Sequence, residues 1–296
     1  MQNSVKRKRR YLREGLFLIT VLLALIGFRV ALADRGQKED VCWWEIPLIA
    51  HAGSGIDGKT LTNSLEAMNQ AAKNGYRMIE VDFSFTNDEQ LVLAHGWDEH
   101  SAEMLEIPEG IPDLETFRAT KIHRKYTSMT VEDLIAWMKK HRDIYIVTDT
   151  KCENPEEMKK EFQYLADVCE YDDELLKRFV VQVYDAKTCD AVMEVYEFPN
   201  IMYATYLHAS EDMTYWNQVV EECSSRGIQT VSVSREYAST SRHPVTPYME
   251  FLKEAGLLVC VHTVNTLTDV ERMRDAGADI VMSDFLYEGD LQYLEI

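Results

Sequence analysis

Acidic residues stand at the ends of two short apolar runs, where a parallel sheet would gather them. Glu80 and Asp82 are two positions apart within the run 78–83, so on a regular strand their side chains face the same side. Asp149 directly follows the run 144–148. Carboxylates gathered in this way repel one another unless a cation or a proton lies between them, and their oxygen atoms suit Mg²⁺ or Ca²⁺. The three residues therefore predict a site for a divalent cation (Ca²⁺ or Mg²⁺).

Two histidines occupy the same kind of position. His51 follows the run 47–50, and His95 closes the run 90–95. Imidazole groups titrate near neutral pH, and no cysteine stands beside either histidine, which favours acid–base chemistry. A cation that polarises a phosphoryl oxygen, with one histidine taking a proton and the other giving one, could perform phosphoryl chemistry. Each residue alone could belong to a turn, a cap or an ion pair, and their joint position favours a site.

Apolar runs of strand length alternate with amphipathic helical segments along the chain, which is typical of parallel βαβ units. Eight such units fit a single (β/α)₈ TIM barrel of about 250 residues, in which chemistry takes place at the carboxyl ends of the strands. The 296 residues, 46% of them hydrophobic, can supply its core. The expected strands are 47–50, 78–83, 144–148, 179–183, 201–205, 230–233, 257–262 and 279–282.

The segments between these strands predict helices. The clearest start is at Thr130, where Asp133 completes a capping box. Run 90–95 should pair back on the second strand as a hairpin, and residues 97–128 show no clear period, which indicates a long loop or a small insertion. The expected helices are 64–74, 130–141, 155–170, 186–197, 212–226, 246–255 and 267–276.

The amino-terminal segment, residues 1–35, predicts export or anchoring. A basic run at 6–10 precedes an apolar stretch at 16–28, which is short beside the ~20 residues of a membrane span. Extension to 15–32 lengthens the stretch but includes Arg29, which could reach the interface. We expect a hydrophobic helix that anchors the protein in a membrane by a single pass, with the catalytic domain, residues 36–296, outside the cytoplasm.

Two alternatives to the anchor stay open. Ala31 and Ala33 form a small-x-small pattern, so the segment could be a signal peptide cleaved near Ala33, which would secrete the protein. It could also be a helix that stays in the cytoplasm. The six cysteines lack metal-binding spacing and leave a disulfide open, and Cys260 is expected in the core.

The charge is divided unevenly between the two parts of the chain. Residues 1–35 hold eight of the 31 Lys and Arg and two of the 50 Asp and Glu. The remaining domain therefore has 23 basic and 48 acidic side chains, a net charge of −25. Such a domain is a poor binder of nucleic acid, and anionic lipid would repel it. We expect no nucleic-acid partner, and a membrane partner only through the amino-terminal segment.

Several short motifs, in order, resemble the glycerophosphodiester phosphodiesterase family of the PLC-like TIM-barrel superfamily. They are His-Ala-Gly at 51–53, Thr-Asn-Ser-Leu-Glu-Ala at 62–67, Glu-Val-Asp at 80–82, Leu-Val-Leu-Ala-His at 91–95, Asp-Thr-Lys at 149–151, His-Thr-Val-Asn at 262–265 and Gly-Ala-Asp-Ile-Val-Met-Ser-Asp at 277–284. The family's own pattern has Trp where His262 stands. The likeness covers about 47–285, nearly the whole domain.

The resemblance implies a divalent cation and hydrolysis of a phosphodiester to an alcohol and a phosphomonoester. In that family the glycerol hydroxyl beside the phosphate is thought to attack first and to give a cyclic intermediate. The resemblance implies these roles: Glu80, Asp82 and Asp149 hold the metal, His51 and His95 are the general acid/base pair, Lys151 contacts the phosphate, and Asn63 orients the His51 loop or the substrate.

Some positions depart from the family pattern. Ala52 replaces an Arg, which removes a fixed cationic contact to phosphate, and Asp149 is shorter than the family's Glu. The glycine-rich loop 53–58 could offer backbone N–H groups to the phosphate instead.

Three functions therefore stay open. The first is a metal-dependent hydrolase of small glycerophosphodiester-type substrates outside the cytoplasm. The second is a phospholipase C/D-like phosphodiesterase acting on membrane lipids or a lipid-derived substrate, and the third is a binding pseudoenzyme without catalysis.

Overall fold

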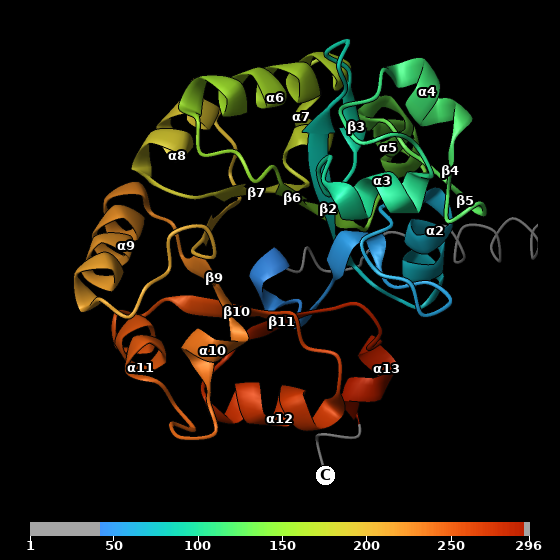
Figure 1. Ribbon diagram of the computed structural model, residues 1–296. Helices are drawn as coiled ribbons and strands as arrows, with labels where there is room; N and C mark the ends of the chain where they lie inside the picture. The colour runs from blue at the N-terminus through green and yellow to red at the C-terminus, as the bar shows by residue number, and fades with distance from the viewer. Residues whose placement is uncertain (1–41, 293–296) are drawn as a thin grey trace, which may run out of the picture. The chain divides into compact units, whose positions relative to one another are not determined.

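Eight parallel strands close into a barrel in the computed structural model, which describes residues 42–292 (Figure 1). The first strand, β1 (Leu48–Ala50), pairs with β2 (Met78–Phe85) on one side and with the last strand, β11 (Ile280–Ser283), on the other, which closes the cylinder. The predicted (β/α)₈ barrel is confirmed. The strands between are β6 (Tyr145–Asp149), β7 (Phe179–Val183), β8 (Ile201–Ala204), β9 (Thr230–Ser234) and β10 (Leu258–His262).

Helices surround this barrel in the ring that Figure 1 shows. Each presents an apolar face to the strands, and most begin at a side chain that caps the first turn. The long ones are α2 (Leu65–Lys73), α5 (Val131–Met138), α6 (Pro155–Val168), α8 (Ala186–Met193), α9 (Met213–Arg226), α11 (Pro247–Glu254) and α12 (Leu267–Asp275). Sequence periodicity did not predict the four-residue helices α7 (Asp173–Leu176), α10 (Arg235–Ala238) and α13 (Glu288–Leu291), nor the 3₁₀ turns Trp43–Glu45 and His51–Gly53.

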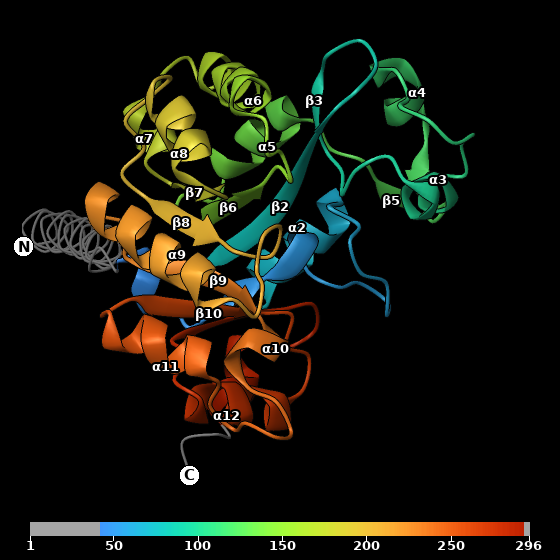
Figure 2. The same cartoon turned by 60° about the vertical axis from the view of Figure 1, so that its left-hand side comes forward.

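An extra hairpin strand and an insertion follow β2. Strand β3 (Leu91–Leu93) pairs antiparallel with the end of β2, as expected, and leads directly to His95. Residues 97–128 are a small insertion with two helices, α3 (Glu99–Leu105) and α4 (Leu114–Ala119), and the hairpin of β4 (Lys121–Ile122) and β5 (Tyr126–Thr127). Figure 2 shows α3 and α4 beyond β3, outside the ring of helices.

The insertion has an apolar cluster of its own and is tied to the loop before α2. Phe117 packs there with Ala67 and Val92. Asp57 accepts a hydrogen bond from Tyr126 Oη (2.7 Å), and Glu66 accepts one from the Thr127 N–H (2.7 Å). These contacts fix the loop that carries Asn63.

The expected amino-terminal helix, residues 1–35, lies outside the described residues. Within 42–292 no helix combines the length and the apolar character needed to cross a bilayer. The six cysteines all fall in this range and are free thiols, and Cys260 is buried in the core as expected.

The capping box at the start of α5 is confirmed and gives a test of local stability. Thr130 Oγ1 accepts from the Asp133 N–H (3.3 Å), and Asp133 Oδ2 accepts from the Thr130 N–H (3.1 Å). We expect Thr130→Ala to lower the free energy of unfolding, measured by urea denaturation, by about 1 kcal/mol because an N–H of the first turn loses its partner. Thr130→Ser keeps the hydroxyl and serves as the control. Equal losses in both variants would mean that the buried methyl group matters, not the cap.

Candidate active site

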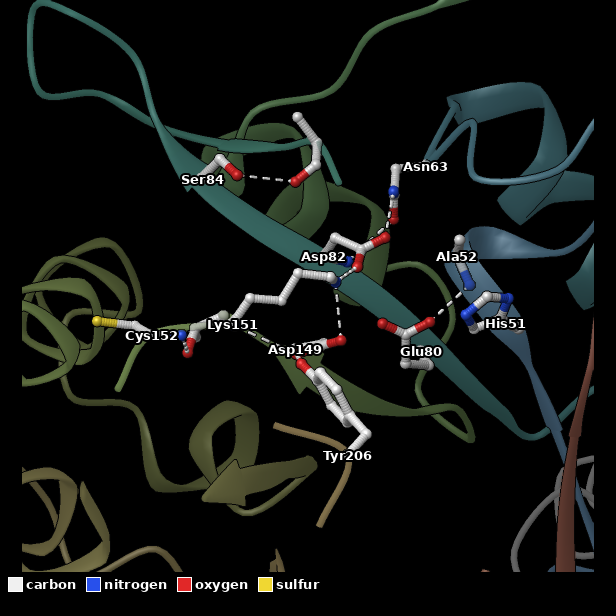
Figure 3. Close-up of polar contacts among 12 residues, drawn as sticks. His51, Ala52, Asn63, Glu80, Asp82, Ser84, Asp149, Lys151, Cys152 and Tyr206 are labelled. Carbon is white, nitrogen blue, oxygen red and sulfur yellow. Dashed lines mark hydrogen bonds and ion pairs between the residues drawn. The ribbon is translucent and has the colours of Figure 1, made fainter. Parts of the chain in front are cut away.

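Three carboxylates meet at the mouth of the barrel. Glu80 and Asp82 lie on β2 and are each 1% exposed, and Asp149 ends the neighbouring strand β6, where it stands opposite Asp82 in the register. One oxygen atom from each lies within 4.8 Å of the others (Figure 3). The structure therefore brings together the three residues that the sequence singled out as metal ligands.

Lys151 supplies the nearest positive charge. Its ammonium group forms ion pairs with Asp82 and with Asp149 Oδ2, the latter at 2.8 Å, and Figure 3 shows its side chain reaching between the two. Burial opposes the charged form of the lysine, but the nearby carboxylates outweigh it and hold the pKa of Lys151 above its ordinary value.

Neutral donors hold the remaining carboxylate oxygens, except one. Glu80 Oε2 accepts from the Ala52 N–H (2.6 Å), and Asp149 Oδ1 accepts from the hydroxyls of Tyr184 (2.5 Å) and Tyr206 (2.6 Å). Glu80 Oε1 is buried and has no hydrogen-bond partner within residues 42–292. Burial, followed by the charge of Asp82, raises the pKa of Glu80. One unpaired buried oxygen in an all-oxygen donor set fits a hard divalent cation such as Mg²⁺ or Ca²⁺.

Asn63 supports this cluster from behind. Its Nδ2 donates to Asp82 Oδ2 (2.7 Å), its Oδ1 accepts from the Asp82 N–H (3.0 Å), and its own N–H donates to the carbonyl of Ala52 (3.1 Å). The residue is fully buried. Asn63 thus joins the turn that carries His51 to the carboxylates.

His51 is held by an aspartate far away in the sequence. Its Nδ1 lies 2.8 Å from Asp284 Oδ1, and Asn265 Nδ2 donates to the other oxygen of Asp284 (2.7 Å). Burial would lower the pKa of His51, but the bond to Asp284 and the charge of Glu80 outweigh it and raise this pKa to about 9. Asp284 is the last residue of the motif at 277–284. Its place in that motif was the only indication from the sequence that it belongs to the site.

His95 lies across the same cavity in a different environment. It follows β3, and two hydrogen bonds hold the preceding residue, Ala94. The Ala94 carbonyl accepts from Ser84 Oγ (2.9 Å), and the Ala94 N–H donates to the Asp82 carbonyl (3.1 Å). Burial lowers the pKa of His95. The two histidines thus have pKa values displaced in opposite directions.

Three N–H groups of the glycine-rich loop 53–58 form hydrogen bonds within the protein. Gly55 also has no room for a side chain, because a Cβ there would lie 2.3 Å from the ring of Phe285. The expectation that this loop offers N–H groups to a phosphate is therefore not supported for three of its residues. The three N–H groups donate to backbone carbonyls of the protein: Ser54 to the carbonyl of His51 (2.8 Å), Gly55 to the carbonyl of Asp284 (2.6 Å) and Ile56 to the carbonyl of Lys59 (2.9 Å).

These groups surround a cavity of about 150 Å³ at the carboxyl ends of the strands. That is below the ~300–1,000 Å³ of pockets for drug-sized ligands, so it suits a small group. Its lining residues are His51, Glu80, His95, Asp149, Lys151, Gln182, Tyr206, Ser232, His262 and Met282.

The barrel and its acidic mouth are those of the PLC-like phosphodiesterase class of TIM barrels. Residues 51–288 match the model of the glycerophosphoryl diester phosphodiesterase family, and the chain belongs to that family. It is accordingly a phosphoric diester hydrolase by family. No curated protein sequence matches the chain closely enough to count as a relative.

Solved structures share the fold at low sequence identity. A glycerophosphodiester phosphodiesterase from Parabacteroides distasonis is 19% identical, with 85% of this chain and 97% of that chain covered and a TM-score of 0.65. One from Thermotoga maritima is 15% identical, with 85% and 98% covered and a TM-score of 0.61. A phosphodiesterase from Oleispira antarctica, solved with the product sn-glycerol-3-phosphate, is 14% identical, with 84% and 97% covered and a TM-score of 0.65.

Replacement of Glu80 tests the cation site through stability. Because the pKa of Glu80 is raised on folding, the folded protein keeps that proton to higher pH than the unfolded chain. The metal-free protein should therefore lose stability as the pH rises above about 4.5, the ordinary carboxyl value. We expect Glu80→Gln to reduce this loss, and to abolish the rise in melting temperature that Ca²⁺ or Mg²⁺ gives the wild type. That rise corresponds to about 2.7 kcal/mol at a hundredfold excess over Kd.

Glu161 on α6 offers a matched control. It is 7% exposed, its pKa is raised to about 8, mainly by burial, and it is not one of the three clustered carboxylates. Glu161→Gln should also reduce the pH-dependent loss of stability but should keep the effect of the cation. Loss of the cation effect in both variants, or in neither, would contradict a site at Glu80.

Proposed function

We propose that the protein hydrolyses small glycerophosphodiesters with a divalent cation, with His51 as general acid and His95 as general base. The coarser activity, glycerophosphodiester hydrolysis, follows from the family. The observation that carries the finer proposal is the meeting of three carboxylates, a lysine and two differently tuned histidines around one small cavity.

The opposite pKa displacements support the assignment of the two histidines. A pair of titratable groups whose environments separate their pKa values is typical of an acid and a base that act together. His51, with its pKa near 9, carries a proton at neutral pH, whereas burial favours neutral His95. His95 can therefore take a proton while His51 gives one.

The proposed reaction has two proton-balanced steps. The hydroxyl beside the phosphate attacks phosphorus as His95 takes its proton, and the bond to the leaving alcohol breaks as His51 protonates that oxygen. Water then opens the cyclic phosphate with the two histidines in exchanged roles, which restores both. A divalent cation bound to Glu80, Asp82 and Asp149 would polarise the phosphoryl oxygens and offset their charge.

Lys151 is the proposed phosphate contact. It is the only lysine or arginine among the described residues that line the cavity, and Ala52 offers no charge in place of the family's arginine. Asn63, in this proposal, positions Asp82 and the His51 turn and does not touch the substrate.

The cavity size favours small diesters over membrane lipids. A space of about 150 Å³ accommodates a phosphate with a short alcohol and leaves the second alcohol at the opening. Location remains part of the proposal and rests on the sequence: residues 1–35 anchor the domain 36–296 outside the cytoplasm, and cleavage near Ala33 would release it instead.

Turnover assays test the reaction. With Ca²⁺ or Mg²⁺ present, the purified protein should hydrolyse glycerophosphocholine and glycerophosphoethanolamine, release glycerol phosphate, and leave sphingomyelin intact. EDTA should stop turnover. His51→Asn and His95→Asn should each lower kcat by about 10²–10⁴-fold, because each removes a proton-transfer group.

The exposed His243 provides the control, since His243→Asn should keep wild-type kcat. Turnover that survives EDTA, or full activity in either active-site variant, would contradict the mechanism. Cation binding without any turnover would favour the pseudoenzyme, and hydrolysis of sphingomyelin or lysophospholipid alone would favour the lipid-directed alternative.

Asp284→Asn tests the tuning of His51 through the pH profile. Loss of the aspartate's negative charge should lower the pKa of His51 from about 9. The high-pH limb of kcat, where the general acid loses its proton, should therefore move to lower pH, while the low-pH limb set by His95 stays in place. A uniform fall in kcat with both limbs unmoved would show that Asp284 has a structural role only.

A further inference from the structure

One wall of the cavity has no role in the proposed reaction. It consists of polar side chains from three further strands: Gln182 on β7, which is next to β6, and Ser232 on β9 and His262 at the end of β10, which stand across the barrel from β2 and β6. Gln182 and Ser232 are almost completely buried. Buried polar groups need hydrogen-bond partners, because burial without one costs free energy.

His262 is the member of this wall with an unpaired buried atom. Its Nε2 is buried and finds no hydrogen-bond partner in the part of the chain that the structure describes. The ring packs edge-on against Tyr206, with centroids 5.8 Å apart and planes at 80°, which fixes its orientation. A buried nitrogen without a partner lowers stability, so a ligand group that bonds to it is favoured.

The ring of His262 suits a neutral ligand group. Burial, and then the charge of His51, lower its pKa to about 4, so the imidazole is neutral at physiological pH. A neutral imidazole has one donor and one acceptor nitrogen, which matches a hydroxyl group, whereas an anionic phosphate is bound more strongly by a charged donor. The family pattern has Trp at this position, and an indole can only donate.

The cavity places His262 on the alcohol side of the proposed substrate. Strand β10, which ends at His262, stands across the barrel from β6, which ends at Asp149, and His262, Lys151, Glu80 and Asp149 all line the same space of about 150 Å³. In a glycerol ester one hydroxyl lies beside the phosphate and attacks, and the other lies at the far end of the three-carbon chain. This distal hydroxyl is the group left for the polar wall.

We propose that His262 is a specificity-determining residue whose Nε2 forms a hydrogen bond with the distal hydroxyl of the substrate's alcohol. The inference rests on the proposed function, since the same cavity must hold the diester. It follows that the enzyme selects three-carbon alcohols with a terminal hydroxyl over alcohols of the same length that lack it.

Two chromogenic esters that differ by this hydroxyl test the proposal. Glyceryl p-nitrophenyl phosphate has the distal hydroxyl, and 2-hydroxypropyl p-nitrophenyl phosphate lacks it but keeps the attacking one. With Ca²⁺ or Mg²⁺, the wild type should prefer the glyceryl ester by about fivefold in kcat/KM, which corresponds to the usual contribution of one net hydrogen bond. His262→Phe keeps an aromatic ring against Tyr206 and should abolish this preference, with hydroxypropyl turnover nearly unchanged.

Two further variants separate recognition from packing. His262→Gln can place an amide near the position of Nε2 and should restore most of the preference. Met282→Leu changes an apolar residue of the same cavity and should lower both rates together, leaving the preference as in the wild type. An equal loss on both esters in His262→Phe, or a wild type without any preference, would overturn the proposal.

A binding experiment distinguishes this failure from failure of the proposed reaction. If the wild type hydrolyses neither ester, calorimetric titration with sn-glycerol 3-phosphate and with 2-hydroxypropyl phosphate, which lacks only the distal hydroxyl, tests His262 alone in the presence of Ca²⁺. Tighter binding of glycerol phosphate that is lost in His262→Phe would support the residue's role and reject only the reaction. Equal binding of the two phosphates, or binding of neither, would overturn the role of His262 as well.

Discussion

Glu80, Asp82 and Asp149 have oxygen atoms within 4.8 Å of one another, and two of these residues are almost wholly buried. Charges this close in a site of low dielectric repel strongly, so the surrounding structure has to compensate for them. Lys151 pairs with two of the carboxylates, the Ala52 N–H bonds to the third, and two tyrosine hydroxyls hold Asp149. One oxygen, Glu80 Oε1, is left without a partner among residues 42–292. Most of the site can be understood as the means of keeping this cluster intact for a cation.

The barrel makes the cluster possible because its register is fixed over the whole sheet. Asp82 and Asp149 stand opposite each other on β2 and β6, and a slip of either strand by one residue would turn its carboxylate away from the mouth. Closure of β1 against β11 places His51 next to Asp284, although 233 positions separate them in the sequence. The insertion contributes indirectly, since its hairpin holds the loop from which Asn63 reaches Asp82.

The sequence predicted much of this arrangement, and its limits have a physical cause. Buried parallel strands are apolar runs, so all eight could be placed to within one or two residues, and residues directly after them could be expected at the mouth. Spacing within one strand likewise placed Glu80 beside Asp82. Partners such as Tyr184, Tyr206 and Asp284 were not foreseen, because their contacts depend on how distant strands align and on which rotamer a long side chain adopts. Four-residue helices were missed for another reason: they are too short to show a period.

The replacement of an arginine by Ala52 changes how the site can bind a diester. His51 and Asp284 form a pair of opposite charges, so the charges left are three carboxylates and Lys151, and a divalent cation would balance them. The family pattern has an arginine at the position of Ala52, and its charge would balance the single negative charge of the diester. In this chain no side chain of the turn His51–Gly53 carries such a charge for the diester. The N–H groups of Ser54, Gly55 and Ile56 do not replace it, since each is bonded within the protein. Phosphate binding in the proposed function therefore depends more on the cation, and recognition has to draw more on the alcohol. His262 lines the same cavity, and its Nε2 has no partner among residues 42–292, so the missing arginine and the proposed contact of His262 with the alcohol are both consistent with a change in the part of the substrate that the enzyme recognises.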